Sequence, residues 1–368
     1  MKPAVVFGTR PEAIKMAPVV KELEHRKIDH VVIVTAQHRE MLDQKLGVFD
    51  IHPKHDLNIM QKDQDLFHVT TAVLNKIKPV LAAEKPDVLL VQGDTTTTFA
   101  ASLAAFYLKI KVGHVEAGLR TWNKMNPFPE EINRQLTTRL TDFHFAPTEW
   151  AKNNLLGEGV KPENIYVTGN TVIDALLMIV DPTYRFDNPL LNEIDFARRK
   201  VILLTSHRRE NFGEPMEQTF LACREIVEQN PEVELIYPVH PNPNVRKAAK
   251  KILADVPRIH LIEPMEYRPF VQLMNKCYLI LTDSGGVQEE APSLGKPVLV
   301  LRSTTERPEA IDAGTAKLVG TDRARIIETA QRLLRDQSEY RSMSTKSNPY
   351  GDGKAAARIV DILERHSG

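Results

Sequence analysis

Residues that suit anion binding follow apolar runs in both halves of the chain. Arg10 and Lys15 come after the apolar run 4–8. In the second half, LTDSGGVQEEAP (281–292) ends an apolar run with Ser284, Gly285 and Gly286 and continues into a helix pattern. Adjacent glycines let the backbone approach a bulky group, and a helix N-terminus offers unpaired N–H groups with partial positive charge. A phosphate group suits such a turn.

Each of these positions also has a purely structural interpretation. The glycines can serve only a tight turn, with Glu289 and Glu290 satisfying the helix dipole. Arg10 and Lys15 can be the solvated start of a helix. Loop residues at strand ends are often functional, which favours the binding interpretation.

Further cationic side chains in the second half repeat the pattern. His207 and Arg208 follow the apolar run 201–206, His240 ends the run 233–240, and Arg307 follows the run 297–302. The alternatives are that His207 is surface charge beside two arginines and that His240 is held only by its neighbouring prolines. A cationic zone is predicted from His207 and Arg307 together with Arg10, Lys15 and the Ser-Gly-Gly turn.

Three carboxylates form a second group, in the first half. Asp94 follows the run 88–93, Glu116 lies at the end of the run 111–117, and Glu130 opens a helix pattern that also carries Arg134. Carboxylates beside a reacting carbon can act as general acids and bases. Alternatively, Asp94 caps the threonine-rich helix that follows it, and Glu116 and Glu130 form salt bridges with Arg120 and Arg134.

The elements that must position these residues are short apolar runs alternating with amphipathic stretches, which is typical of βα units and a parallel sheet. His114, inside one run, is expected to be a satisfied core residue. Ligands of open α/β sheets lie beyond the carboxyl ends of strands, so we expect the candidate residues to gather in a cleft between two domains. Strands are predicted at 4–8, 30–36, 88–93, 111–117 and 142–147, and again at 201–206, 233–240, 259–264, 278–283 and 297–302, on either side of an irregular connection at 181–199.

Composition excludes several classes of protein. Lys plus Arg and Asp plus Glu total 48 each, which argues against a dedicated nucleic-acid binder. The chain has no Gly-x-Gly-x-x-Gly fingerprint, Walker loop or His-Glu-x-x-His pair, so we expect neither a dinucleotide cofactor nor a metal. The spacing of Cys223 and Cys277 suggests no disulfide framework. With no signal-peptide pattern and no run of roughly 18 apolar residues, we expect a cytoplasmic protein without a membrane partner.

The motifs, taken in order, resemble those of the non-hydrolysing UDP-N-acetylglucosamine 2-epimerases over essentially the whole chain. The resemblance implies a glycosyltransferase-B-like pair of Rossmann-like domains, with boundaries expected at 1–172, 173–350 and a final helix in 351–368 that packs back on the first domain. It also implies a cytoplasmic homodimer that interconverts UDP-GlcNAc and UDP-ManNAc for surface polysaccharides and needs no cofactor. The segments that carry it are GTRPEAIKMAPV (8–19), QGDTTTT (92–98), GHVEAGLRT (113–121), PFPEEINRQ (127–135), TSHRRENFG (205–213), LTDSGGVQEEAPSLGKPVLVLR (281–302), TTERPE (304–309) and NPYGDG (348–353).

Site roles carried over from the family agree with the two zones. The positions that match the family's diphosphate ligands are Arg10, Lys15, Ser284, Gly285, Gly286 and Arg307. Glu290 matches the ribose ligand, and Phe270 lies in the segment that lines the uracil. Asp94, Glu116, Glu130 and His207 match the positions implicated in catalysis, with Arg134 supporting them. The family route eliminates UDP to give 2-acetamidoglucal and adds it back; which carboxylate removes the proton stays open.

Many bacterial members are activated by a second UDP-GlcNAc. Gln37, Glu130, Arg208 and His240 match that site. Glu40 and Asp63 depart from it, standing where those members have Gln and Arg. Negative charge near a diphosphate weakens its binding, so we expect reduced or altered activation. A hydrolysing 2-epimerase, a glycosyltransferase on the same fold and a sugar-nucleotide binding protein without catalysis are the alternative functions.

Overall fold

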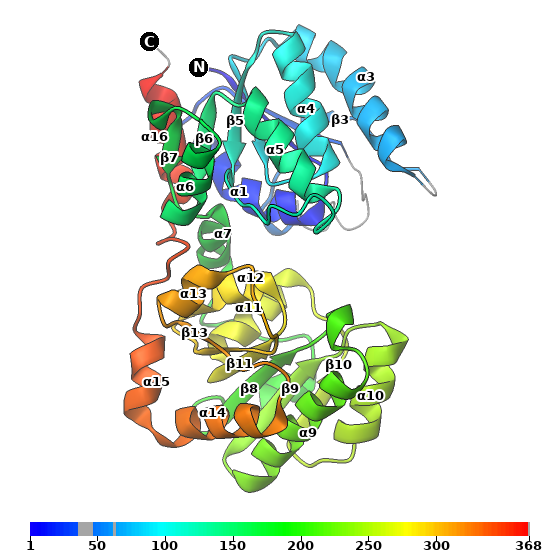
Figure 1. The fold of residues 1–368 in the computed structure, drawn as a ribbon, viewed down its shortest axis with the longest axis vertical. Coiled ribbons are helices and arrows are strands. Elements are labelled where there is room, and N and C mark those ends of the chain that lie inside the picture. The colour runs from blue at the N-terminus through cyan, green and yellow to red at the C-terminus, as the bar shows by residue number, and fades with distance from the viewer. Residues whose placement is uncertain (36–46, 62–63, 367–368) are drawn as a thin grey trace. The chain divides into compact units, whose positions relative to one another are not determined.

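The computed structural model describes residues 1–35, 47–61 and 64–366. They form two compact units, Met1–Met178 with Tyr350–Gly368, and Ile179–Pro349. Each unit contains one parallel β-sheet with helices on its faces (Figure 1). No helix within the described ranges is long and apolar enough to cross a membrane.

The first unit is built on a seven-stranded sheet of order β3-β2-β1-β4-β5-β6-β7. Its strands are β1 (Pro3–Phe7), β2 (Val31–Val34), β3 (His55–Asp56), β4 (Val88–Gln92), β5 (Lys111–Val115), β6 (Phe143–Ala146) and β7 (Ile165–Val167). Its helices are α1 (Arg10–His25), α3 (Leu66–Glu84), α4 (Thr96–Tyr107), α5 (Glu130–Leu140), α6 (Glu149–Gly157), α7 (Thr171–Ile179) and α16 (Ala355–Arg365), with a 3₁₀ turn η1 (Pro162–Asn164).

Alternation along the strands explains how this sheet is covered on two faces. Ala4, Val6, Val31 and Ile33 join residues of α3 and α4 in one buried cluster. The residues between them, such as Val5 and Phe7, are equally buried and belong to the opposite face. Strands that are apolar at every position are those of a sheet covered on both faces. Helix α1 contacts β1, β4 and α16.

The second unit has a six-stranded sheet of order β10-β9-β8-β11-β12-β13. Its strands are β8 (Lys200–Thr205), β9 (Val233–Pro238), β10 (Ile259–Ile262), β11 (Leu279–Thr282), β12 (Val298–Val300) and β13 (Ala316–Leu318). Its helices are α8 (Pro189–Glu193), α9 (Glu214–Gln229), α10 (Pro243–Leu253), α11 (Tyr267–Lys276), α12 (Gly285–Glu290), α13 (Pro308–Asp312), α14 (Arg323–Arg335) and α15 (Gln337–Ser344), with 3₁₀ turns η2 (Arg209–Asn211) and η3 (Ala291–Leu294). Its main core joins the sheet to α9, α10 and α14.

Every strand predicted from the apolar runs is present, and the prediction of two doubly wound α/β sheets is confirmed. The edge strands β3, β7 and β13 escaped prediction because each is only two or three residues long. The irregular segment 181–199 contains one short helix, α8.

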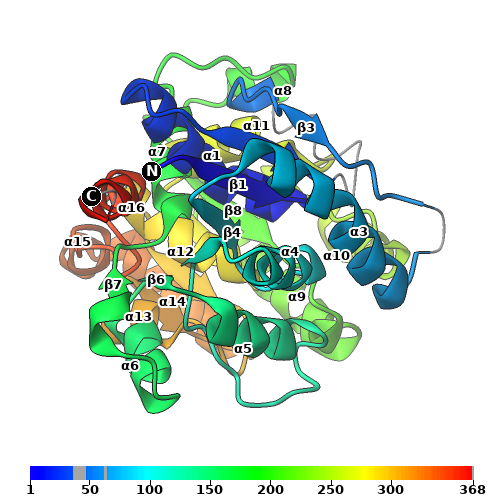
Figure 2. The ribbon, with the colours of Figure 1, turned by 90° about the horizontal axis from the view of Figure 1, so that it is seen from above.

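Helix α16 brings the last described residues back to the first unit, so that both chain ends belong to it (Figures 1 and 2). Its first turn lacks a cap from its own N-cap residue. Instead, Asp174 of α7 accepts a hydrogen bond from the Ala356 N–H at 2.8 Å. Further along, Arg26 pairs with Asp361 at 2.6 Å and with Glu364 at 2.7 Å. These contacts fix α16 to α1 and α7.

Candidate functional site

Both sheets bring the predicted site residues to the points where strand order reverses, the usual ligand position in open α/β sheets. In the first unit the order reverses between β1 and β4. Arg10 and Lys15 follow β1, Asp94 follows β4, and Glu116 follows the neighbouring β5. In the second unit it reverses between β8 and β11, which precede His207 and Ser284. The two units are described in turn.

Lys15 and Glu116 form the first pair of the carboxylate zone. The Nζ of Lys15 lies 2.5 Å from Oε2 of Glu116, and Asn170 donates to the same oxygen at 2.9 Å. Glu116 has a φ of +66°, which costs a residue other than glycine of the order of 1 kcal/mol. The alternative that Glu116 forms a salt bridge with Arg120 is wrong, because Arg120 pairs with Glu158. The Glu116 carboxylate thus lies beside the Lys15 ammonium group at the carboxyl end of the sheet's strands.

Asp94 and Arg134 form the second pair. The Arg134 guanidinium donates to Oδ2 of Asp94 and lies 3.5 Å from Glu131, while Asn133 donates to the Asp94 carbonyl at 3.0 Å. The alternative that Asp94 caps α4 is wrong, since Thr95 is the N-cap and accepts from the Thr98 N–H. Helix α5 therefore supplies both a cation for the Asp94 carboxylate and an amide for its backbone.

Glu130 is the first residue of α5 and is half-buried. Its side chain makes no hydrogen bond or ion pair with another residue of the described part of the chain, so the alternative of a salt bridge with Arg134 is wrong. The next residue, Glu131, is fully buried and accepts from the backbone N–H groups of Thr121 and Trp122, both at 3.0 Å. Desolvation by burial raises the pKa of Glu131, but these donors, Gln135 and Arg134 outweigh it and leave the pKa below its usual value.

Glu12 is the residue in this unit that sequence reasoning missed. It is 2% exposed, and its Oε2 accepts from the N–H groups of Gly8 and Thr9 at 3.0 and 2.7 Å. The hydroxyls of Thr95 and Thr98 donate to its Oε1 at 2.7 and 3.2 Å. One carboxyl group thereby ties the loop that leads to Arg10 to the loop that carries Asp94. Burial is the largest influence and raises the pKa of Glu12.

His114 is a core residue, as predicted. It is fully buried, and its Nε2 lies 2.7 Å from the Gly93 carbonyl, directly before Asp94. Its neighbour across the sheet is His144. Burial lowers the pKa of His114 to about 4 and that of His144 to about 3, so both rings are neutral near pH 7.

In the second unit Asp283, which was not singled out from the sequence, is the centre of the site. Its Oδ2 accepts from the N–H groups of His207 and Arg208 at 2.8 and 2.9 Å. The ring Nδ1 of His207 lies 3.2 Å from the other oxygen, Oδ1. The His207 ring also stacks on His240 with centroids 5.4 Å apart. The structure thus brings His207, Arg208 and His240 together, with His240 exposed.

The predicted glycine turn forms the start of α12, with Ser284 as the N-cap. A Cβ on Gly285 would lie 3.9 Å from Nη2 of Arg208, and a Cβ on Gly286 would meet no atom within 4 Å. The turn therefore has the Arg208 guanidinium on one side and open space on the other. Both features suit an anionic ligand.

The other predicted ligand residues of this unit surround α12. Glu290 accepts from the Tyr267 hydroxyl at 2.5 Å, and Phe270 lies half-buried on the same helix as Tyr267. The Arg307 guanidinium pairs with Glu289. Glu289 and Glu290 are almost completely buried.

Three positions from the sequence argument, Gln37, Glu40 and Asp63, lie outside the described residues. Within the described ranges no group of three or more His, Cys, Asp or Glu side chains is arranged to hold a metal ion.

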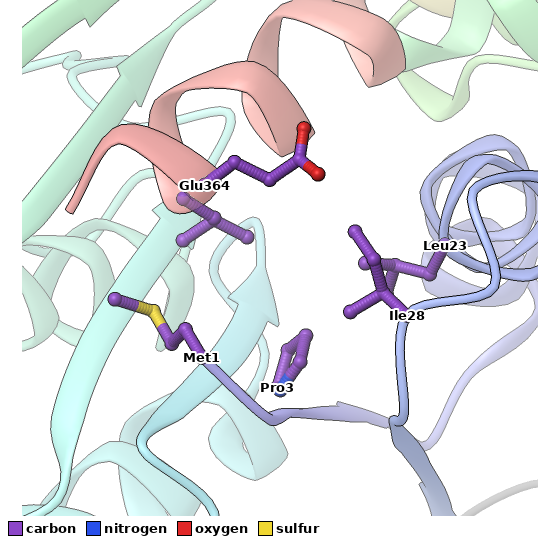
Figure 3. Close-up of a pocket in the computed structure, with 6 residues that line it drawn as sticks. Met1, Pro3, Leu23, Ile28 and Glu364 are labelled. Carbon is purple, nitrogen blue, oxygen red and sulfur yellow. The ribbon is translucent and has the colours of Figure 1, made fainter. Parts of the chain in front are cut away.

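Away from the site, a pocket of about 250 Å³ is lined by Met1, Pro3, Leu23, Ile28, Leu363 and Glu364 (Figure 3). None of the predicted site residues lines this pocket.

Residues 21–364 match the sequence model of the family described as UDP-N-acetylglucosamine 2-epimerase. The chain belongs to this family. The UDP-N-acetylglucosamine 2-epimerase of Bacillus subtilis is 58% identical over 369 residues, which cover 100% of this chain and 96% of the relative. The family assignment by resemblance of motifs is therefore confirmed.

Solved structures agree with this assignment. A structure described as a putative UDP-N-acetylglucosamine 2-epimerase from Listeria monocytogenes is 54% identical with a TM-score of 0.94, covering 99% of this chain and 96% of that one. The Neisseria meningitidis UDP-GlcNAc 2-epimerase bound to UDP-GlcNAc is 52% identical with a TM-score of 0.86, covering 99% and 100%. The glycotransferase of kitacinnamycin, at 13% identity and a TM-score of 0.68, shares the fold alone.

Proposed function

We propose that this epimerase inverts C2 of UDP-GlcNAc reversibly to give UDP-ManNAc, without net hydrolysis. The observation that carries the proposal is the pair of carboxylates at neighbouring strand ends, Glu116 beside Lys15 and Asp94 beside Arg134. A carboxylate is the form of the side chain that can accept a proton. The UDP-GlcNAc bound to the Neisseria relative supports the substrate class.

The chemistry explains why such an enzyme needs both anion-binding groups and carboxylates. The proton on C2 of the sugar is barely acidic. As UDP departs from C1 with the bonding electron pair, C1 becomes oxocarbenium-like and the neighbouring C–H bond acidifies. Groups that stabilise the leaving diphosphate therefore also promote proton loss. The product of this elimination is 2-acetamidoglucal, and re-addition of UDP with protonation from the opposite face inverts C2.

Inversion needs proton transfer on both faces of the ring, so more than one acid–base group must act. We assign Asp94 and Glu116 to the C2 proton, with Glu130 as their partner and Arg134 in support. The diphosphate ligands are Arg10, Lys15, Ser284, Gly285, Gly286 and Arg307, while His207 steadies the departing phosphate. Glu290 binds the ribose, and Phe270 lines the uracil.

Incubation with UDP-GlcNAc in heavy water, followed by proton NMR, tests the reaction. We expect deuterium at C2 in a mixture with UDP-ManNAc and little free UDP. Free N-acetylmannosamine as the main product would show instead a hydrolysing 2-epimerase. Retention of the C2 proton after inversion would refute the elimination route.

A variant pair tests the carboxylate assignment. Asp94→Asn removes the proton acceptor, so it should abolish C2 exchange while UDP affinity stays within about threefold of wild type. Asp29→Asn is the matched control, because Asp29 is exposed in the same unit and should leave exchange unchanged. Unreduced exchange in Asp94→Asn would remove Asp94 from the reaction.

We further propose that activation by a second substrate molecule is weak or altered. Arg208 and His240 lie together in the second unit, but the acidic residues Glu40 and Asp63 replace neutral and basic ones, and their charge opposes a second diphosphate. Initial rates should therefore rise linearly with UDP-GlcNAc at low concentration. Clear sigmoidality would contradict this.

We also propose that the enzyme is a cytoplasmic homodimer whose contact involves α3, α4 and α5. These helices lie side by side (Figures 1 and 2) and expose Phe67, Phe106, Tyr107 and Leu136. Large exposed apolar side chains on neighbouring helices favour this face as an association surface. Light scattering should give twice the chain mass, and Phe106→Asp should shift the enzyme toward monomer. A wild-type monomer at micromolar concentration would refute this.

A further inference from the structure

Asp283 is a fully buried carboxylate whose two oxygens have different surroundings. Oδ2 accepts two short backbone hydrogen bonds, from His207 and Arg208, and also contacts Oγ of Ser206 at 3.3 Å and Nδ2 of Asn211 at 3.4 Å. This oxygen alone is sufficient to order the loop between β8 and η2. The role of the other oxygen must be different.

Oδ1 is buried and accepts no hydrogen bond from any residue of the described part of the chain. The His207 ring Nδ1 lies 3.2 Å away, which is within ion-pair distance although not aligned as a hydrogen bond. A buried carboxylate oxygen without a donor is energetically unfavourable. The nearest available donor is a proton on Nδ1, because the loop amides already serve Oδ2.

We propose that Asp283 is a positioning residue that holds His207 in the Nδ1–H tautomer and frees its Nε2 for the ligand. The tautomer of a histidine is set by the partner of one ring nitrogen, which leaves the other for function. In this form the neutral ring offers a lone pair on Nε2, and the charged ring offers an Nε2–H. The inference rests on the proposed function: in the charged ring Nδ1–H faces Asp283, and Nε2–H donates to the departing phosphate.

Three groups around His207 act on its protonation in opposite directions. His240, on the loop after β9, stacks on the ring, and Arg208 is adjacent in sequence; both disfavour a second positive charge. Asp283, after β11, favours it. Burial is the largest influence and, with His240 and Arg208, leaves the pKa of His207 below its ordinary value. Of these groups, Asp283 is therefore the one that favours protonation of the His207 ring.

Asp283→Asn makes a sharp test because the geometry dictates how the amide must lie. Its carbonyl oxygen has to accept from the His207 and Arg208 N–H groups, which turns its NH₂ toward His207 Nδ1. A ring nitrogen that faces a donor must be the acceptor, so the ring should switch to the Nε2–H tautomer. Ser206→Ala is the matched control, since it removes a contact of Oδ2 and leaves the carboxylate in place.

The measurement is the ¹⁵N–¹H spectrum of the full chain labelled at histidine, without substrate, with His207→Gln to assign the signal. We expect Nδ1–H in wild type and Ser206→Ala, and Nε2–H in Asp283→Asn, with the His207 titration midpoint lower by about 1 pH unit or more. An Nε2–H tautomer in wild type would overturn the proposal even if the variant fails to fold. An unchanged tautomer and midpoint in Asp283→Asn would also overturn it.

Activity is read separately, so that the two proposals can fail independently. Asp283→Asn should lower kcat at least about 10-fold at unchanged KM, because an amide NH₂ that faces Nδ1 disfavours the charged ring that donates to the departing phosphate. A tautomer switch without C2 exchange even in wild type would support the Asp283 role and refute the epimerase reaction. A switch that leaves kcat intact would show that the reaction does not need the charged His207 ring.

Discussion

Replacing Glu12 should separate the effect of its charge from the effect of its hydrogen bonds. In Glu12→Ala the buried N–H of Gly8 and the N–H of Thr9 lose their acceptor, whereas the threonine hydroxyls can rotate to other partners. Each unsatisfied amide costs about 1–3 kcal/mol, so two amides give a loss of about 2–6 kcal/mol. That is a large fraction of the 5–15 kcal/mol typical of a folded domain.

Glu12→Gln should behave differently. The glutamine carbonyl can take the Oε2 position and accept both N–H groups, while its NH₂ takes the Oε1 position and donates to the oxygens of Thr95 and Thr98, whose hydrogens can reorient. Burial raises the pKa of Glu12, so little is lost when a neutral group replaces the carboxyl. We expect a cost of no more than about 1 kcal/mol.

Urea unfolding followed by tryptophan fluorescence provides the assay. The chain has two tryptophans, Trp122 and Trp150, and both belong to the first unit, so the signal reports on the unit that contains Glu12. Equal losses in the alanine and glutamine variants would refute the hydrogen-bond account, since charge or side-chain volume would then dominate. A loss below about 1 kcal/mol in Glu12→Ala would refute it as well.

Three further predictions use the same unfolding assay. Burial holds the folded-state pKa of His114 near 4 and that of His144 near 3, so just below pH 6.5 these two rings are protonated only in the unfolded chain. The free energy of unfolding should therefore fall by about 1.4 kcal/mol per histidine for each unit by which the pH is lowered. A flat profile from pH 6.5 to 5 would contradict this. Gly118→Ala should cost more than about 1–3 kcal/mol, since φ is +93° and a Cβ would lie 2.3 Å from the Ala151 carbonyl oxygen; a neutral variant would refute the clash. Asp174→Ala should cost about 0.5–2 kcal/mol and speed amide exchange in the first turn of α16, and unchanged exchange would show that the cap is dispensable.

The fold was predictable because its central strands are continuous apolar runs with helical patterns between them. Strands buried on both faces, such as β4 and β8, give this signal without ambiguity. The edge strands β3, β7 and β13 do not, because strands of two or three residues, such as His55–Asp56, have no periodicity to detect. The pairing of β3 is decided by the neighbouring β2 rather than by its own residues.

The candidate site was predictable as a list of residues but not as a set of partners. Arg134 was linked to Glu130 by proximity in sequence, yet it pairs with Asp94, forty positions earlier. A helix turns its successive side chains to different sides, so adjacent residues such as Glu130 and Glu131 have unrelated surroundings. Glu12 and Asp283 were overlooked because an acid at a helix start or strand end is ordinary in sequence. Only the fold reveals that several loop amides converge on each.

The attachment of α16 to the first unit bears on how the chain folds as it is made. Residues 179–349 leave the ribosome before α16 does, so the second unit can be complete while the first still exposes the surface that α16 covers. Until α16 packs on the first unit, Arg26 lacks its carboxylate partners Asp361 and Glu364, and the apolar side of α1 remains exposed to solvent. The interval in which a chaperone has most to protect therefore falls between the synthesis of residues 179–349 and that of α16, and it concerns the half that was made first.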